Sequence, residues 1–314
     1  MTAAGAAAPV LVMKHGALGD LVQATGPMQA IRHHHPGARI TLLTTRPFAD
    51  FMAGCPWIDA VWVDDRPPAW NLPAVLRLGR RLRGGGFGRV YDLQTSGRSS
   101  RYLRFFGRPR PEWSGIAAGA SHPHANPDRD RMHTLDRQRE QLAMAGIARV
   151  PPPSLDWVAD GPLPPGVPDR PFVLLVPGGS AHRPEKRWPI DRFAGLAAEL
   201  AAAGIAPVVV GGGGERPLAA AIRAAAPDAV DLTGATGLAD LVRLGRRAQA
   251  VVGNDTGPVH LLAVAGAPTV VLFSAASDPA LCQPRGAAVR VLRESALADL
   301  GVGSVAAALA ALAP

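Results

Sequence analysis

Short apolar runs alternate along the chain with longer segments in which apolar residues recur at helical spacing. The apolar runs predict strands at Val10–Met13, Arg39–Leu43, Ala60–Val63, Arg89–Leu93, Phe172–Val176, Pro207–Val210, Ala250–Val252 and Thr269–Phe273. The longer segments predict helices at Leu21–His34, Ala74–Arg83, Met132–Ala145, Asp191–Ala203, Pro217–Ala225, Leu238–Arg246, Val259–Ala265 and Ser295–Leu312. Because the strands are continuously apolar and alternate with helices, the pattern predicts an α/β fold with parallel sheets covered on both faces.

Proline marks a division near the middle of the chain. A length of 314 residues is typical of about two domains. Eight prolines fall between Val150 and Pro171, and proline fixes φ and removes a backbone donor, so this stretch reads as a stiff connection. We therefore expect an N-terminal domain over residues 1–155, a linker over 156–170, a second domain over 171–290 and a C-terminal helix within 291–314.

The composition of the chain argues against disulfide-rich, zinc-binding and membrane-spanning proteins. Hydrophobic residues make up 47% of the chain, which is enough for a sizeable core. The two cysteines, Cys55 and Cys282, cannot form a disulfide framework, and no Cys/His cluster suggests zinc. No apolar stretch reaches the length that spans a bilayer. We expect a cytoplasmic protein, soluble or with a peripheral membrane contact.

Positive charge is concentrated in one stretch. The net charge is +8, and residues 77–110 contain ten arginines, Arg98 and Arg101 among them, against the single acid Asp92. Such a block attracts phosphate-rich substrates or an anionic membrane surface. No nucleic-acid-binding motif accompanies it, so nucleic acid is not an expected partner. A solvated helix face remains the alternative interpretation.

The first predicted strand runs into the segment KHGALGD. Gly16 and Gly19 permit a tight turn with close backbone approach. Asp20 then stands at the start of a helix, where it can stabilise the helix end or act as a general base. His33, His34 and His35 suit the end of this helix, and we expect them at the surface rather than as ligands.

Two glycine-rich strand ends open the second half. Gly178, Gly179 and Ser180 precede a loop with His182, Arg183, Lys186 and Arg187, a composition that suits a phosphate, although no P-loop motif is present. Gly211–Gly214 precede Glu215, which can cap a helix or accept hydrogen bonds from ribose hydroxyls. The spacing GxGxxG is not met, which disfavours a dinucleotide-binding oxidoreductase.

The segment GNDTGPVH follows another buried strand. Asn254 or Asp255 can cap the helix that Pro258 helps to start. Thr256 and Gly257 leave backbone N–H groups free at the positive end of that helix, a suitable cradle for a diphosphate. His260 lies one turn further, where a structural role is the alternative. Together these strand ends predict a nucleotide-diphosphate site. The triplet Asp128-Arg129-Asp130 matches a metal-binding DxD pattern, but it lies in a polar loop, and we expect no metal site there.

The chain resembles a known family in five segments: KHGALGDLVQATGPMQAIR, PGGS…PEKRWP, GGGGE, DLTGATGLADL and GNDTGPVHLLAVAGAPTVVLF. Their order resembles that of glycosyltransferase family 9, the ADP-heptose:lipopolysaccharide heptosyltransferases and their relatives. The resemblance implies a GT-B fold, with two Rossmann-like domains facing across a cleft. It also implies an inverting, metal-independent enzyme without a cofactor, which transfers a heptose or related sugar from an ADP-sugar to a lipopolysaccharide core. In such enzymes the last helix often crosses back to the first domain.

The resemblance also assigns roles. Asp20 matches the general base, Lys186 the lysine on the phosphates, and Glu215 the acid on the ribose. The donor-binding set is Gly19, Ser180, Lys186, Glu215, Asp255, Thr256, Gly257 and His260. The arginine block suits an anionic acceptor, for which we single out Arg98 and Arg101. The loop before Lys186 departs from some relatives, because Ala181 and His182 stand near positions where those relatives carry hydroxyl groups.

Two alternatives remain open from the sequence. One is a non-catalytic module of the same fold that binds nucleotide sugars and does not need Asp20. The other is a family member with a different sugar donor or acceptor. The heptosyltransferase interpretation implies a protein in the cytoplasm that touches the inner face of the cytoplasmic membrane.

Overall fold

The computed structural model describes residues 7–180 and 182–312. The chain divides into two compact units at Pro153/Ser154. Each unit contains a six-stranded sheet in which every pair of neighbouring strands is parallel. The predicted α/β class with parallel sheets is therefore confirmed.

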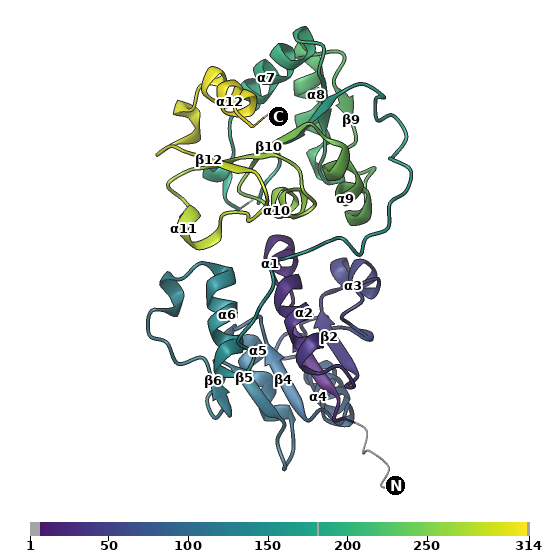
Figure 1. Ribbon diagram of the computed structural model, residues 1–314, viewed down its shortest axis with the longest axis vertical. Coiled ribbons are helices and arrows are strands. Elements are labelled where there is room, and N and C mark those ends of the chain that lie inside the picture. Colours follow the sequence, from purple (N-terminus) through teal and green to yellow (C-terminus); the bar gives the residue numbers. More distant parts are fainter. Residues whose placement is uncertain (1–6, 181, 313–314) are drawn as a thin grey trace. The chain divides into compact units, whose positions relative to one another are not determined.

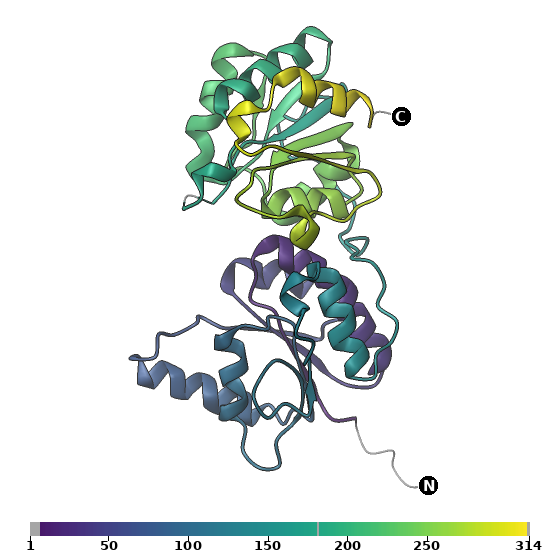
Figure 2. The ribbon, with the colours of Figure 1, turned by 90° about the vertical axis from the view of Figure 1, so that its left-hand side faces the viewer.

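The first unit has the strand order β3-β2-β1-β4-β5-β6. Its strands are β1 (Val10–Met13), β2 (Ile40–Thr44), β3 (Ala60–Val63), β4 (Arg89–Asp92), β5 (Glu112–Gly115) and β6 (His122–Pro123). Its helices are α1 (Leu18–Gln23), α2 (Thr25–His34), α3 (Arg46–Ala53), α4 (Leu72–Gly84), α5 (Gly97–Arg101) and α6 (Thr134–Met144), with 3-10 turns at Tyr102–Phe105 and Arg129–Arg131. Helices α2 and α6 lie side by side on one face of the sheet, and α4 covers the other (Figures 1 and 2).

The second unit has the strand order β12-β11-β10-β7-β8-β9. Its strands are β7 (Phe172–Val176), β8 (Ala206–Val209), β9 (Val230–Asp231), β10 (Ala250–Asn254), β11 (Thr269–Phe273) and β12 (Val289–Arg293). Its helices are α7 (Ile190–Ala202), α8 (Arg216–Ala225), α9 (Leu238–Arg247), α10 (Gly257–Val264), α11 (Pro279–Cys282) and α12 (Val302–Ala310), with 3-10 turns at Pro184–Lys186, Gly213–Glu215 and Leu297–Asp299. Helices α7, α8 and α12 cover one face, and α9 and α10 pack together on the other (Figure 1).

Both sheets reverse their strand order at one point. In the first unit the chain proceeds outward on one side of β1 and then continues from β4 on the other side; in the second unit the corresponding pair is β7 and β10. Ligands of open α/β sheets bind beyond the carboxyl ends of the strands at such a switch point. Ligand-binding residues are therefore expected just after β1, β4, β7 and β10.

Two predicted helices differ from the structure, and some strands were not predicted. The single helix predicted over Leu21–His34 is two helices that meet at Ala24, because Pro27 lacks the N–H that would continue the ladder across the junction. The helix predicted over Ser295–Leu312 is a 3-10 turn followed by α12, with Gly301 between them. Strand β12 was not predicted, because its exposed arginines, Arg290 and Arg293, interrupt the apolar run at the sheet edge.

Both ends of the second unit pack against the unit itself. Val305, Ala308 and Leu309 of α12 belong to its core, against α7 and β11. Part of the expected linker is also anchored, because Arg246 of α9 donates hydrogen bonds to the carbonyls of Leu155 and Val158. The expected linker therefore begins as a packed segment of the second unit.

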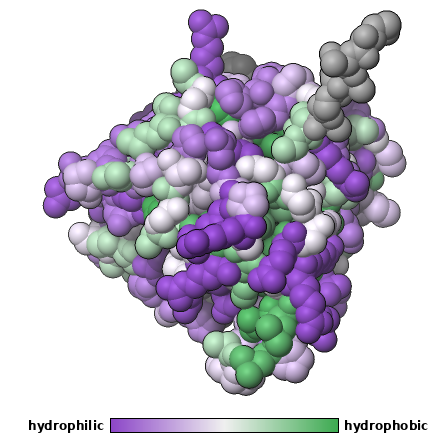
Figure 3. Space-filling model, turned by 90° about the horizontal axis from the view of Figure 1, so that it is seen from below, coloured by the Kyte–Doolittle hydropathy of each residue, from purple (hydrophilic) through white to green (hydrophobic). Residues whose placement is uncertain are grey.

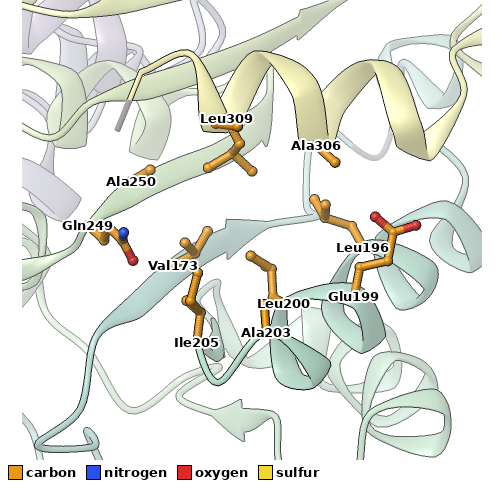
Figure 4. A pocket seen from close by; sticks show the side chains of 11 residues that line it. Val173, Leu196, Glu199, Leu200, Ala203, Ile205, Gln249, Ala250, Ala306 and Leu309 are labelled. Atoms are coloured by element: carbon orange, nitrogen blue, oxygen red, sulfur yellow. The ribbon is translucent and has the colours of Figure 1, made fainter. Parts of the chain in front are cut away.

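An apolar cavity of about 230 Å³ lies where α12 and α7 cover the amino ends of β7 and β10. Side chains such as Val173, Leu200 and Leu309 point into it (Figure 4). It is at the opposite ends of the strands from the polar residues described below. Among the residues that the structure describes, no helix combines the length and the apolar character needed to cross a membrane.

Candidate active site

A polar pocket lies beyond the carboxyl ends of β7 and β10. Its volume is about 320 Å³. It is lined by Val176, Gly178, Gly179, Ser180, Glu215, Asp255, Thr256, Gly257 and Pro258. These residues come from three separate segments that the switch point of the second sheet brings together. The structure thus collects at one place most of the second-unit residues that the sequence singled out.

Asp255 is the centre of a charged network beside this pocket. Its Oδ2 atom accepts hydrogen bonds from Lys186 Nζ at 2.6 Å and from Ser277 Oγ at 2.8 Å, and its Oδ1 atom lies 3.8 Å from His260 Nε2. Burial alone would raise the pKa of the Asp255 carboxyl, but hydrogen bonds with His260, Lys186 and Ser277 outweigh it and lower the pKa to about 2. Asp255 is therefore a permanent anion that holds the Lys186 ammonium at the edge of the pocket.

Asn254 is a site residue whose role the sequence did not reveal. It is fully buried; its Oδ1 atom accepts the N–H of Trp188 at 2.9 Å, and its Nδ2 atom donates to the carbonyls of Pro177 and Gly178 at 2.9 and 3.1 Å. These bonds join the end of β10 to the end of β7 and to the loop that carries Lys186. Neither Asn254 nor Asp255 caps α10, so that prediction is wrong: one side chain serves as this tie and the other as the partner of Lys186.

The start of α10 presents backbone donors to the pocket. Thr256 is the N-terminal cap residue, with an extended backbone and no capping hydrogen bond from its side chain, and its Oγ1 atom is buried without a partner among the described residues. Gly257 is the first residue of the helix, and Pro258 follows it. The first N–H groups of a helix have no partner within the helix and carry its positive partial charge. This arrangement can accept an anion such as a phosphate.

Two glycines make room for Glu215. A Cβ atom at Gly178 would lie 1.5 Å from Glu215 Oε1, and one at Gly211 would lie 2.3 Å from Oε2. The carboxylate accepts the N–H of Gly212 at 2.7 Å. A residue with a side chain at Gly178 would therefore displace the carboxylate from the pocket. The sequence indicated a phosphate-binding composition after Gly178, whereas the structure shows that Gly178 and Gly211 provide space for one particular side chain.

The basic loop after Ser180 is only partly free. Arg187 donates to the carbonyl of Gly179 at 2.6 Å, and Arg183 donates to the carbonyl of Ala276 at 2.6 Å. Ser180 is exposed and lines the pocket. The loop therefore presents Lys186 and Ser180 at the pocket, while its arginines bind backbone oxygens.

In the first unit, Gly19 and Asp20 lie in α1, just beyond the end of β1. Asp20 is in the first turn, half-buried, and it does not cap the helix, because Ala17 is the cap residue. Lys14 is buried where β1 ends and donates to the carbonyl of Leu93 at 3.2 Å. Burial lowers the pKa of the Lys14 ammonium, while the charges of Asp20 and Asp92 act in the opposite direction. Sequence analysis did not single out Lys14.

A second acid lies at the same switch point. Asp92 ends β4 and is fully buried, and its burial raises the pKa of its carboxyl to about 6 against hydrogen bonds from Thr95 and Ser99. Beside it, His15 Nε2 lies 3.0 Å from Asp64 Oδ2, which also accepts the Tyr102 hydroxyl at 2.6 Å. The carboxyl edge of the first sheet is therefore a dense polar network, and the charge of Asp20 acts on its buried Lys14.

The two predicted acceptor arginines occupy α5. Arg98 is half-buried and donates to the carbonyl of Pro67 at 3.0 Å, so part of its guanidinium is already engaged. Arg101 is exposed and bonds to the carbonyl of Gly97 within its own helix. Like Gly19 and Asp20, both belong to the first unit, whereas the other predicted site residues belong to the second.

The DxD-like triplet has an ordinary structural role. Asp130 pairs with Arg129 at 2.8 Å and lies 3.7 Å from Arg137, and Asp128 lies 3.6 Å from Arg131. Within residues 7–180 and 182–312, no three His, Cys, Asp or Glu side chains are grouped as metal ligands. Both aspartates of the triplet are thus paired with arginine side chains.

Comparison with known proteins identifies a family. The family model "Glycosyltransferase family 9 (heptosyltransferase)" matches residues 75–300. The lipopolysaccharide heptosyltransferase 2 of Salmonella typhimurium is 26% identical over 306 residues, which cover 90% of this chain and 87% of that protein. The lipooligosaccharide heptosyltransferase 2 of Haemophilus influenzae is 34% identical over 114 residues, or 35% of this chain and 33% of that protein.

Solved structures share the fold. The structure of E. coli ADP-heptose lps heptosyltransferase II superposes with a TM-score of 0.79 at 22% identity, covering 97% of this chain and 98% of that one. The E. coli heptosyltransferase WaaC with ADP also gives 0.79, at 19% identity, with 97% and 100% covered. These matches confirm the predicted GT-B fold class.

Proposed function

The chain belongs to glycosyltransferase family 9, and from this premise we propose that it transfers a heptose, or a closely related sugar, from an ADP-linked donor to a lipopolysaccharide-core acceptor. The transfer inverts the anomeric centre and needs no metal ion. The observation that carries the proposal is the convergence of Lys186, Glu215, Asp255 and the start of α10 on one pocket at the switch point of the second sheet. Relatives support the choice of substrates, since one solved structure of the same fold holds ADP and another holds ADP-2-deoxy-2-fluoro heptose.

The pocket would hold the donor through its diphosphate and its ribose. The N–H groups of Thr256 and Gly257 and the ammonium of Lys186 supply positive charge to the diphosphate. Glu215 accepts hydrogen bonds from ribose hydroxyls. Ser180 and His260 add donors to the phosphates and the sugar.

The chemistry requires one proton acceptor and one stabilised leaving group. Asp20 takes the proton of the acceptor hydroxyl as its oxygen attacks the anomeric carbon of the sugar. The bond from that carbon to the ADP oxygen breaks, and ADP leaves with the electron pair. Lys186 and the N-terminus of α10 stabilise the charge that develops on the diphosphate. Attack opposite the leaving group inverts the configuration.

The acceptor would be recognised by positive charge on the first unit. Arg98 and Arg101 lie on α5, which begins a short loop after β4, and both can pair with phosphate or carboxylate groups of a lipopolysaccharide core. The reaction would take place in the cytoplasm, with a peripheral contact to the inner face of the cytoplasmic membrane, where such an acceptor is anchored.

A transfer assay tests this proposal. The purified protein is mixed with ADP-heptose and a lipopolysaccharide-core acceptor, and the gain in acceptor mass and the release of ADP are measured. We expect Asp20→Asn to lower turnover by about 10²–10⁴-fold and to leave ADP affinity unchanged, because a general base contributes a factor of that order. Asp50→Asn, an exposed acid on α3 of the same unit, is the matched control and should retain turnover.

Two results would contradict the proposal. Transfer by Asp20→Asn at the wild-type rate would show that Asp20 is not the general base. Binding of ADP-heptose without any transfer, for several core acceptors, would favour the non-catalytic binding module.

A further inference from the structure

We propose that the outer face of α4 docks the first unit on an anionic lipid bilayer. The docking face consists of Trp70, Leu72, Leu76, Arg77 and Arg80. The inference rests on the proposed function, because an enzyme with a lipid-anchored acceptor has to meet that acceptor at the bilayer surface.

Exposed apolar side chains gather at this place. Among the residues that the structure describes, the large hydrophobic side chains that are exposed are Trp70 (85%), Leu72 (62%), Leu76 (55%) and Met144 (42%). Three of these four fall within seven consecutive residues. The molecular surface in Figure 3 shows a hydrophobic patch at the edge of one face, next to strongly hydrophilic side chains. A cluster of this kind marks an interaction site more often than an isolated exposed leucine does.

The periodicity of α4 places apolar and basic groups on one outer stripe. Leu72, Leu76 and Arg80 are spaced four residues apart and therefore line up along the helix. The flank beside this stripe is buried: Leu82 is fully enclosed, and Gly79 lies so close to Phe105 that a Cβ atom would be 3.0 Å from its ring. The helix is thus fixed on the sheet by one side and presents leucines at its first turns and arginines further along the other.

The charge of this face is positive. Helix α4 carries four arginines and no acid, and Arg77 and Arg80 form no ion pair with any described residue. The acids in the adjoining loop are engaged elsewhere, because Asp64 binds His15 and Tyr102, and Asp65 pairs with Arg46 at 3.0 Å. An uncompensated basic face attracts the anionic headgroups of a cytoplasmic leaflet.

The docking face is held firmly in relation to the polar network of the first unit. The loop before α4 is closed by a hydrogen bond from Asn71 N–H to Pro68 O at 2.9 Å, and Asn71 also caps the helix. Arg98, one of the two proposed acceptor residues, donates to Pro67 in the same loop. Contact with the bilayer through α4 would therefore fix the orientation of α5 at the membrane surface.

A bilayer suits this face better than a second copy of the chain. In a symmetric dimer through α4, Arg77 and Arg80 of one copy would face the same residues of the other, and like charges would repel. At a bilayer, by contrast, Trp70 suits the interfacial region, the leucines enter the headgroup boundary, and the arginines reach the lipid phosphates. Apolar and charged groups then act together.

Co-sedimentation with lipid vesicles tests the inference on the full chain. The vesicles contain phosphatidylcholine alone or phosphatidylcholine with about one third phosphatidylglycerol. We expect binding to the anionic vesicles only, decreasing as salt is added. The double variant Arg77→Glu/Arg80→Glu should bind at least about tenfold more weakly, since each basic residue near such a surface contributes about fivefold. Leu76→Asp should cause a loss of similar size.

Matched controls separate this surface from general effects. Arg223→Glu changes an exposed arginine on α8, and Met144→Asp changes the exposed methionine at the end of α6; both should bind as the wild type does. Transfer to an acceptor without its lipid should remain unchanged in all four variants, so a failure of the proposed transfer would be seen separately from a failure of docking.

Three outcomes would overturn the inference. One is equal binding of the wild type to neutral and anionic vesicles. Another is vesicle binding that the α4 variants leave intact. The third is self-association of the wild type in sedimentation velocity that Leu76→Asp abolishes, since it would assign the face to a second copy of the chain.

Discussion

The buried network around Asp255 predicts a specific dependence of stability on pH. The side chain is 7% exposed, and its pKa falls from 3.8 to about 2 in the folded protein. Because the folded pKa lies below the unfolded one, the carboxylate stabilises the fold above pH 3.8, and this contribution is lost as the pH falls through about 2. A difference of this size corresponds to about 2 kcal/mol in the free energy of unfolding. Asp255→Asn should therefore remove about that much of the pH dependence.

Hydrogen exchange read by mass spectrometry can localise this effect to the second unit. The opening free energy of peptides from β10 is measured in the wild type and in Asp255→Asn at several pH values from 5 to 2, after correction for intrinsic exchange rates. In the wild type it should fall by about 2 kcal/mol more than in the variant over this range. Asp240→Asn, a partly exposed acid on α9, is the control and should follow the wild type closely. Parallel pH profiles for wild type and Asp255→Asn would refute the argument that Lys186, Ser277 and His260 stabilise this carboxylate.

Two further predictions concern the donor pocket, and both are read by calorimetric titration with ADP. Lys186→Ala should weaken ADP binding by about ten- to a hundredfold, the range expected for one charge-assisted hydrogen bond. Arg183→Ala in the same loop is the control and should have little effect. Equal ADP affinities for Lys186→Ala and wild type would mean that the ammonium does not contact the diphosphate. Gly178→Ala should displace Glu215 and weaken ADP binding with the fold retained, whereas Gly214→Ala, where a Cβ meets nothing within 4 Å, should bind as the wild type does; unchanged binding by Gly178→Ala would mean that the carboxylate does not touch the ribose.

The framework of the fold could be predicted from sequence because its strands are buried on both faces. Runs such as Phe172–Val176 and Thr269–Phe273 are apolar at every position, and the structure buries every residue in them. Edge strands are exposed on one side and need no such pattern. Hence β12, with its exposed arginines, was missed, and so were the two-residue edge strands β6 and β9. Strand β5 was missed inside the first sheet, where its short run begins with the exposed Glu112.

The kinds of residue in the site could be predicted, but the hydrogen bonds and ion pairs between them could not. Glycine, hydroxyl and charged residues after strands indicated where a phosphate would fit, since strand ends meet at one edge of a parallel sheet. Which side chain bonds to which depends on loops that cross between strands. Asn254 reads as a helix cap, yet it joins two strand ends. Lys14 was not singled out from the sequence, yet it is buried, and burial lowers its pKa against the opposing charges of Asp20 and Asp92.

The central claim is that the pocket beyond β7 and β10 receives an ADP-linked donor, and calorimetric titration of the wild type with ADP, UDP, GDP and NAD, each with and without magnesium, tests it most directly. We expect ADP to bind most tightly of the four, with an affinity that magnesium does not change. A preference for UDP or GDP would keep the fold and overturn the donor. Tight binding of NAD alone, or of none of the four, would contradict the reading of this pocket as a sugar-nucleotide site.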